Sequence, residues 1–147
     1  MEKKMTKKPT IYLGGPMEGV SEDIWTWRGS FKEDPMLSEI VTYLDPTLRK
    51  AFHSQLYSPN LCRKVMKTDL YDIDRSDIIV ANLKDRDDGK CWGTVMEIMY
   101  AYEKGKVVIT ILEEGFKHPF VEACSTVLVH SVEDAVKELK DFVAWMV

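Results

Sequence analysis

The chain of 147 residues has little cysteine and no long apolar run. Its three cysteines, Cys62, Cys91 and Cys124, are widely spaced and form no Cys-x-x-Cys pair, which argues against a disulfide framework or a zinc site. No apolar stretch approaches the ~20 residues that span a bilayer. The charged N-terminus leads into a short strand rather than into the apolar core of a signal peptide. We therefore expect a cytoplasmic protein with reduced thiols and no membrane partner.

The sequence also lacks the motifs of common cofactor and metal sites. The turn at residues 14–19 (GGPMEG) does not have the G-x-G-x-x-G spacing of a dinucleotide-binding loop, and no G-x-x-x-x-G-K-[ST] phosphate loop occurs. No G-x-S-x-G elbow supports a serine hydrolase. The three histidines, His53, His118 and His130, show no metal-ligand spacing. We predict no cofactor and no metal.

The composition is that of an ordinary globular protein, with 45 % hydrophobic and 30 % charged residues. A net charge of −4 argues against binding to a nucleic acid polymer, which needs a basic surface. The length suits one domain, and we find no internal repeat or linker. We therefore expect a single domain over residues 1–147.

The hydrophobic pattern predicts strands that alternate with helices. Strands are expected at 10–13, 39–44, 77–83, 106–112 and 125–130, and helices at 21–32, 61–75, 95–104 and 131–146. The runs at 77–83 and 106–112 are continuously apolar, as in parallel strands buried on both faces. The fold class is therefore α/β: a flavodoxin-like (Rossmann-like) three-layer sandwich with a five-stranded parallel sheet, order 2-1-3-4-5.

This strand order brings two segments of the chain together. Ligands in such sheets bind at the carboxyl ends of the strands, where the strand order reverses, here between the first and third strands. The loop after the first strand holds Gly14 and Gly15, which allow a ligand to approach the backbone closely. The loop after the third strand leads to the segment 91–97 (CWGTVME). The topology therefore predicts a ligand site between these loops.

Glu97 is the candidate reactive group of that site. With a helix expected at 95–104, Glu97 lies in the first turn, where the helix dipole favours a carboxylate. A structural alternative stays open, because Thr94-x-x-Glu97 fits a capping box in which the glutamate binds the backbone. Cys91 precedes the same helix start, which can lower a thiol pKa, although an inert thiol is the simpler interpretation.

Further candidates are acidic and aromatic. Asp69 and Asp72 are spaced i, i+3 and can share a helix face, which would raise the pKa of one of them. Asp77 at a strand start is expected to be structural. Tyr12 comes just before the two glycines. Just past the glycine turn, Trp27 falls on the apolar stripe of its helix, while Trp25 or Arg28 could line a pocket.

These segments together resemble the nucleoside 2-deoxyribosyltransferase family. The resemblance spans most of the chain in the right order and rests on residues 11–17 (IYLGGPM), 27–28 (WR), 45–47 (DPT), 68–70 (TDL), 75–81 (RSDIIVA), 93–102 (GTVMEIMYAY) and 105–108 (GKVV). It implies the fold derived above and a homo-oligomer. It also implies cleavage of the N-glycosidic bond of 2′-deoxynucleosides through a covalent deoxyribosyl–glutamate, with transfer of the sugar to another base.

The resemblance assigns roles by position. Glu97 would be the nucleophile, Asp69 the acid that protonates or holds the base, and Tyr12 the group that orients Glu97. The substrate would be a nucleoside or nucleotide. Its pocket would be lined by Gly14, Gly15, Pro16, Met17, Trp27, Asp88 and Gly93. Many members carry an acid six residues before the nucleophile, where this chain has Cys91, so Asp87 or Asp88 would have to take its place.

Three alternatives stay open. The chain ends in Trp145-Met146-Val147 rather than in a polar residue, which suits a deoxynucleoside 5′-monophosphate N-glycosidase that passes the sugar to water. The phosphate would then meet Lys117, His118 or Ser125. A nucleotide phosphoribohydrolase of the lysine-decarboxylase-like type normally carries a glycine-rich block that Lys90-Cys91-Trp92 replaces here. An inactive nucleotide-binding module is the third alternative.

Overall fold

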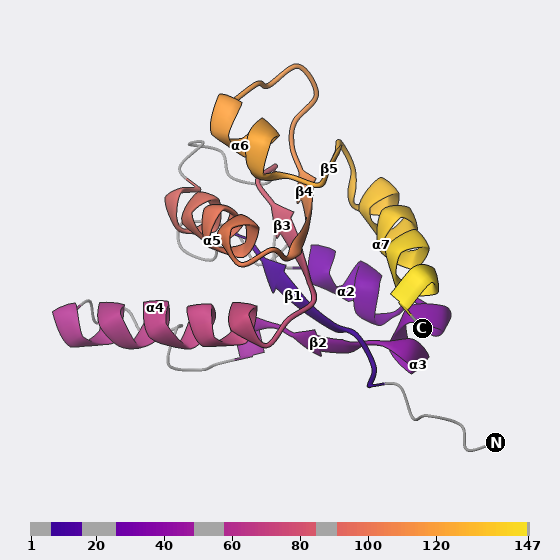
Figure 1. Ribbon diagram of the computed structural model, residues 1–147, viewed down its shortest axis with the longest axis horizontal. Helices are drawn as coiled ribbons and strands as arrows, with labels where there is room; N and C mark the ends of the chain where they lie inside the picture. The colour runs from indigo at the N-terminus through magenta and orange to yellow at the C-terminus, as the bar shows by residue number, and fades with distance from the viewer. Residues whose placement is uncertain (1–6, 16–25, 49–57, 85–90, 147) are drawn as a thin grey trace.

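Five parallel strands form one sheet in the order β2-β1-β3-β4-β5, which confirms the predicted class and strand order (Figure 1). The structure is a computed structural model that describes residues 7–15, 26–48, 58–84 and 91–146. The strands are β1 (Thr10–Gly14), β2 (Thr42–Leu44), β3 (Ile78–Asn82), β4 (Val107–Ile111) and β5 (Val127–Val129).

Helices cover both faces of the sheet (Figure 1). One face carries α4 (Pro59–Asp74), α5 (Trp92–Glu103) and α6 (Pro119–Cys124). The other carries α2 (Trp27–Lys32), α3 (Pro35–Ile40) and α7 (Val132–Met146), and a 3-10 turn, η1 (Pro46–Leu48), follows β2. The helices after β1 and after β3 therefore lie on opposite faces, so the strand order reverses between these strands as predicted.

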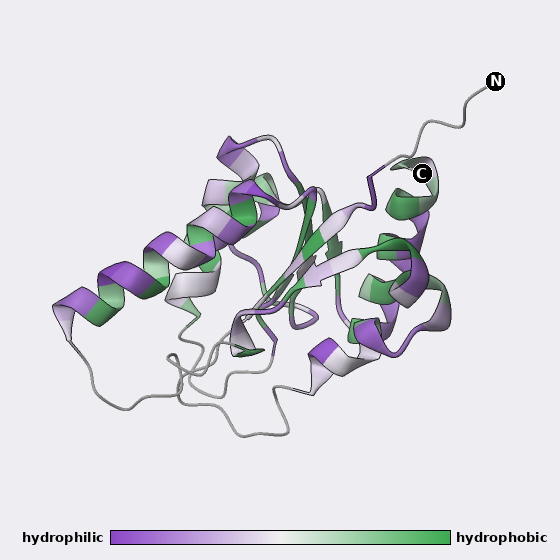
Figure 2. Ribbon diagram, turned by 90° about the horizontal axis from the view of Figure 1, so that it is seen from below, coloured by the Kyte–Doolittle hydropathy of each residue, from purple (hydrophilic) through white to green (hydrophobic). Residues whose placement is uncertain are grey.

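The sheet separates two apolar cores, and Figure 2 shows the apolar strands between the two helical layers. Successive side chains of a strand point to opposite faces. Ile11 and Leu13 of β1 accordingly join the core under α2 and α7, whereas Tyr12 joins the core under α5. All five residues of β3 are buried, as the unbroken apolar run predicts.

The predicted strand at 39–44 is too long, because its first residues belong to a helix. The Asp34 side chain accepts hydrogen bonds from the backbone N–H groups of Met36 and Leu37, at 3.1 and 3.0 Å, and Pro35 occupies the first helical position. This capped start stabilises α3 through Ile40. Only Thr42–Leu44 remains as β2.

Other boundaries also differ from the prediction. Helix α4 begins at Pro59, two residues early, because Ser58 caps it by accepting a hydrogen bond from Leu61 N–H. Helix α6 is absent from the prediction; it starts at Pro119, where a His118 ring nitrogen accepts from Phe120 N–H. The predicted helix at 21–32 is described from Trp27 on, and its expected cap Ser21 lies outside the described residues. No helix in the described ranges has the length and apolarity needed to cross a membrane.

Packing of α7 against the sheet provides a test of the fold. Leu139 is fully buried in the core under α7, so Leu139→Ala leaves a cavity and should lower the free energy of unfolding by about 2–5 kcal/mol. Lys137 is exposed on the same helix, and Lys137→Ala should change that energy by less than ~0.5 kcal/mol. Urea unfolding measures both. Equal effects of the two substitutions would contradict the packing of α7.

Candidate active site

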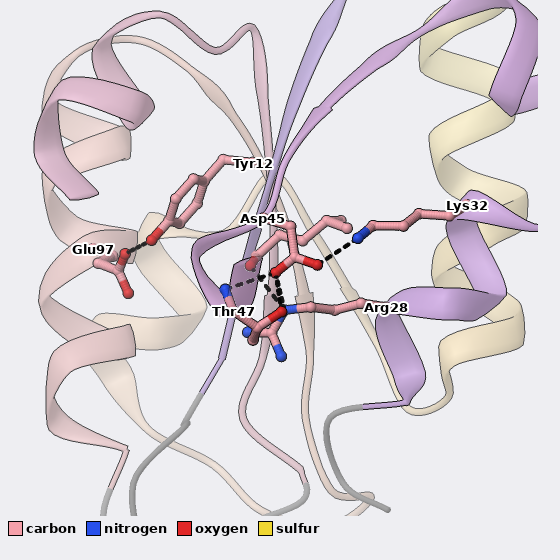
Figure 3. A network of polar contacts seen from close by, with 7 residues as sticks. Tyr12, Arg28, Lys32, Asp45, Thr47 and Glu97 are labelled. Carbon is pink, nitrogen blue, oxygen red and sulfur yellow. Dashed lines mark hydrogen bonds and ion pairs between the residues drawn. The ribbon is translucent and has the colours of Figure 1, made fainter. Parts of the chain in front are cut away.

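Tyr12 and Glu97 meet at the α5 side of the sheet. Tyr12 is fully buried, and its hydroxyl group donates a hydrogen bond to Glu97 Oε2 (Figure 3). The two residues are 85 positions apart in the sequence and come from β1 and α5. This is the contact that the orienting role expected for Tyr12 requires.

The start of α5 differs from the prediction, and the capping box is wrong. The helix begins at Trp92 rather than at residue 95, with Cys91 as its N-cap residue and a hydrogen bond from Val95 N–H to Cys91 O at 2.9 Å. Thr94 is therefore a buried residue inside the helix, and no acidic residue lies in the first turn. Glu97 is too far along the helix to cap it, so its carboxylate is directed to Tyr12 instead.

Glu97 has a strongly altered acidity. Burial raises its pKa to about 8, and the negative charge of Asp69 adds to the rise. The hydrogen bond from Tyr12 and the positive charge of Arg28 act in the opposite direction. Asp69 lies on α4, the helix packed beside α5, and thus within electrostatic reach of Glu97. Two carboxyl groups in this relation tend to share one proton, as an acid and a base or nucleophile must.

Tyr12 stays a hydrogen-bond donor. Burial raises the pKa of its phenol well above the ordinary value, and the charges of Glu97 and Asp69 raise it further. The hydroxyl group is therefore protonated at neutral pH, and the hydrogen bond that it donates to Glu97 favours the ionised form of that carboxyl group. The contact thus fixes the orientation of the Glu97 carboxyl group.

Gly14 and Gly15, at the carboxyl end of β1, lie close to two different polar groups. A Cβ atom on Gly14 would lie 3.1 Å from Tyr12 Cε1 and 3.8 Å from Glu97 Oε1. A Cβ atom on Gly15 would lie 3.1 Å from the Trp27 ring and 3.5 Å from Arg28 Nη2. The two glycines therefore face different groups, and the absence of side chains leaves both groups close to the backbone.

Arg28 and Asp45 form the second polar group, a pairing that was not predicted from the sequence. Arg28 is only 2 % exposed, and its Nε atom donates to Leu13 O at 3.2 Å and lies 3.4 Å from Asp45 Oδ1. Asp45 also accepts from Lys32 Nζ at 2.5 Å and from Thr47 Oγ1 at 2.6 Å (Figure 3). Burial raises the pKa of Asp45, but these hydrogen bonds outweigh it, and the pKa ends below its ordinary value. In the sequence, the signals that could have pointed to this group were the adjacent residues Trp27-Arg28 and Asp45-Pro46.

The remaining candidates are more dispersed. Trp27 is buried and packs edge-on against Phe31, as expected of a core residue. Gly93 is exposed on α5. Six of the residues considered from the sequence lie outside the described residues: Pro16, Met17, Trp25, His53, Asp87 and Asp88.

Two of the other acidic candidates have structural partners. Asp72 is buried and pairs with Arg75 at 2.6 Å, and Asp77 accepts from Thr10 N–H at 2.8 Å, in the structural role expected for it. Cys91 is buried, with its Sγ atom 3.7 Å from Leu83 O. Within the described ranges, no group of His, Cys, Asp and Glu side chains is arranged to hold a metal ion.

A hollow of about 650 Å³ lies at the opposite edge of the sheet, beside the amino ends of the strands. Its lining includes Lys8, Thr10, Asp77 and Lys106, but neither Tyr12 nor Glu97. Ligands of such sheets bind at the carboxyl ends of the strands. The region around Gly14, Gly15 and Glu97 is therefore a better candidate site than this hollow.

Comparison with known proteins assigns the chain to a family. The family described as "Nucleoside 2-deoxyribosyltransferase like" matches residues 8–116, about three quarters of the chain. The chain belongs to this family. The match contains Tyr12, Asp69 and Glu97, and the resemblance read from the sequence is thereby confirmed. No curated protein matches the chain.

Solved structures share the fold at low sequence identity. A 2-deoxyribosyltransferase from Bacillus psychrosaccharolyticus is 20 % identical with a TM-score of 0.67, over 86 % of this chain and 90 % of that one. A conserved protein from Enterococcus faecalis V583 is 17 % identical with a TM-score of 0.67, over 92 % and 99 %. A 2-deoxyribosyltransferase from Leishmania mexicana is 20 % identical with a TM-score of 0.58, over 92 % and 97 %. This member of the deoxyribosyltransferase-like family thus shares its α/β fold with these proteins.

The raised pKa of Glu97 predicts how the stability of this family member depends on pH. The folded-state pKa of about 8 lies above the ordinary 4.5, so between these values the folded protein holds a proton that the unfolded chain has lost. Stability should therefore fall as the pH rises through this window. Glu97→Gln cannot ionise, so its melting temperature should exceed that of the wild type at pH 8 and approach it at pH 5.

Glu103→Gln is the matched control, because Glu103 is exposed on the same helix. It should not reproduce the gain at pH 8. A wild-type protein that becomes more stable relative to Glu97→Gln between pH 5 and 8 would show that Glu97 is not desolvated.

Proposed function

We propose that the protein cleaves the N-glycosidic bond of 2′-deoxynucleosides or their nucleotides through a covalent deoxyribosyl–Glu97 intermediate and transfers the sugar to another nucleobase. One observation carries the proposal: the Glu97 carboxylate is oriented by Tyr12 at the carboxyl end of β1, beside a glycine that leaves room for a ligand. The family and the fold support the same class of chemistry.

The first step breaks the bond between C1′ of the sugar and the nitrogen of the base. The electron pair of that bond leaves with the base, and positive charge develops at C1′ and the ring oxygen. A Glu97 oxygen stabilises this charge and then forms a bond to C1′. Tyr12 holds the attacking carboxylate in one orientation, because its hydroxyl group donates to the other carboxylate oxygen.

Asp69 supplies the proton that the departing base needs. The electrostatic coupling between Asp69 and Glu97 favours a pair with one proton between them. The reaction requires this proton on Asp69 and the negative charge on Glu97. Positive charge at C1′ stabilises ionised Glu97, so the proton distribution that the chemistry needs becomes favourable as the bond breaks.

The second step releases the sugar from Glu97. A nitrogen of a second base attacks C1′ and returns the electron pair of the C1′–O bond to Glu97, while the proton of that nitrogen passes to Asp69, which the first step left ionised. Water at the same position would give free deoxyribose instead, the hydrolase alternative. Incubation of one deoxynucleoside with and without an acceptor base separates the two reactions: a new nucleoside supports transfer, and free deoxyribose supports hydrolysis.

Exposed apolar side chains support the homo-oligomer that the resemblance implies. Trp92 and Met96 of α5 are 75 % and 73 % exposed, and Phe120 of α6 is 70 % exposed beside them. Exposed apolar patches of this kind commonly mark protein–protein contacts. The homo-oligomer, like the single domain and the cytoplasmic location, stays a prediction.

A trapping experiment tests the role of Glu97. A 2′-fluoro-2′-deoxynucleoside slows the second step, so mass spectrometry should find a fluorodeoxyribosyl adduct on Glu97. Glu97→Gln should abolish the adduct and lower kcat by roughly 10³-fold or more. Glu103→Gln should keep both. Ligand binding without turnover in the wild type and in Glu97→Gln alike would favour the inactive binding module.

Tyr12→Phe tests the orienting contact through a pH profile. The hydrogen bond from Tyr12 lowers the pKa of Glu97, so its loss should raise that pKa and move the acid limb of kcat/KM to higher pH. Tyr100→Phe is the matched control, because Tyr100 donates to another carboxylate, Asp74, at 2.7 Å. A Tyr12→Phe variant that loses rate at all pH values without a shift of the profile would contradict the proposed contact.

A further inference from the structure

Arg28 carries two buried groups with no hydrogen-bond partner. Its terminal nitrogens, Nη1 and Nη2, are inaccessible to solvent and are the buried side-chain polar atoms of the described residues that lack a partner. An unsatisfied buried donor costs about 1–3 kcal/mol, and more when it is charged. Native proteins rarely keep such groups without a reason, so a ligand that supplies acceptor atoms is the natural explanation.

The positive charge of Arg28 is also incompletely balanced. Asp45 is the nearest carboxylate, but it already accepts short hydrogen bonds from Lys32 and Thr47. Arg28 approaches Asp45 only through Nε, at 3.4 Å, while both terminal nitrogens are unused. The ligand that satisfies these nitrogens should therefore be an anion rather than a neutral hydroxyl or amide group.

The guanidinium group is held in a fixed position. It stacks on the Trp27 ring, with its central carbon 4.6 Å from the ring centroid, and Nε is anchored on Leu13 O. Figure 3 shows Arg28 on the side of the strands opposite Glu97. Nη2 lies 3.5 Å from the position of a Cβ atom on Gly15, whereas Glu97 lies beside Gly14. A molecule that lies across both glycines would meet Glu97 at one end and, once the atoms that cover Nη1 and Nη2 move aside, Arg28 at the other.

We propose that Arg28 binds the 5′-phosphate of the substrate, which makes the substrate a nucleoside 5′-monophosphate rather than a nucleoside. This inference rests on the proposed function, since the sugar must lie between the phosphate and Glu97. A guanidinium group matches a phosphate with two parallel hydrogen bonds. A nearby cation is also required, because Glu97 and Asp69 would otherwise repel a phosphate.

The residues first expected to meet a phosphate have other partners. Ser125 Oγ donates to Val121 O at 2.6 Å and contacts Thr110 Oγ1 at 2.7 Å. His118 accepts from Phe120 N–H as the cap of α6. Lys117 is exposed. Arg28 alone among the candidates in the described residues combines burial, positive charge and unused donors.

The test compares four deoxynucleosides with their 5′-monophosphates, base by base. For the accepted base, the wild type should have a kcat/KM at least roughly 100-fold higher for the nucleotide. Arg28→Gln should reduce this preference 10- to 100-fold, the size expected for hydrogen bonds to a charged group. Arg28→Lys keeps the charge but loses the two parallel hydrogen bonds, so its preference for the nucleotide should lie between those of the wild type and Arg28→Gln. Lys32→Gln removes a positive charge from the same cluster and should keep the preference. A wild-type preference near one overturns the proposal without recourse to any variant.

A binding experiment separates this proposal from the proposed function. Calorimetry on Glu97→Gln, which does not depend on turnover, should show tighter binding of deoxyribose 5-phosphate than of deoxyribose, and loss of this difference in the double variant with Arg28→Gln. That result without turnover of any substrate would refute the proposed function and keep the phosphate site. Turnover of nucleosides and nucleotides at equal rates would refute the phosphate site and keep the proposed function. Equal affinity for inorganic phosphate with and without Arg28 would also overturn the phosphate site.

Discussion

The hydrogen bond between Tyr12 and Glu97 is the interaction on which the site depends. It joins the first strand to the helix that follows the third, so it forms only when β1 and β3 pair in the observed register, with Leu13 opposite Val80 and Gly14 opposite Ala81. Side chains alternate along a strand, so a slip of one residue would turn Tyr12 toward the other core. The apolar residues beside Tyr12, Ile11 and Leu13, secure the register because they must be buried under α2 and α7.

Burial gives this hydrogen bond its chemical meaning. A solvated glutamate would be ionised at neutral pH and free to rotate, whereas Glu97 is desolvated, close to the charge of Asp69 and bound by a phenol that stays protonated. A carboxylate that is partly removed from water interacts more strongly with positive charge than a solvated one does. The deoxyribosyl group develops positive charge at C1′ as its bond to the base breaks. The same desolvation that destabilises ionised Glu97 in the free protein can therefore assist the reaction.

The two faces of the sheet divide the polar groups of the site. Glu97, Tyr12 and Asp69 gather on the α5 side, and Arg28 and Asp45 on the α2 side, with Gly14 close to Glu97 and Gly15 close to Arg28. This division follows from the reversal of strand order between β1 and β3, which sends the two following helices to opposite faces. Opposite charges are thereby held near one backbone turn without neutralising each other by direct contact. Membership of the deoxyribosyltransferase-like family establishes the class of protein, and these separate charges bear on the finer question of substrate.

The sequence by itself determined the architecture and the principal candidates. The apolar runs at 78–82 and 107–111 are typical of parallel strands buried on both faces, and the structure places strands there. Their alternation with helices predicted a parallel sheet, and the strand order expected of it placed Tyr12, the glycines and Glu97 at the carboxyl ends of the strands. Tertiary structure alone decided where α5 begins, since Thr94-x-x-Glu97 suits a cap and a helix interior equally well. It also decided the burial of Arg28 with unused nitrogens beside an already satisfied Asp45. These features depend on distances between residues remote in the chain, which local patterns of polarity and capping do not contain.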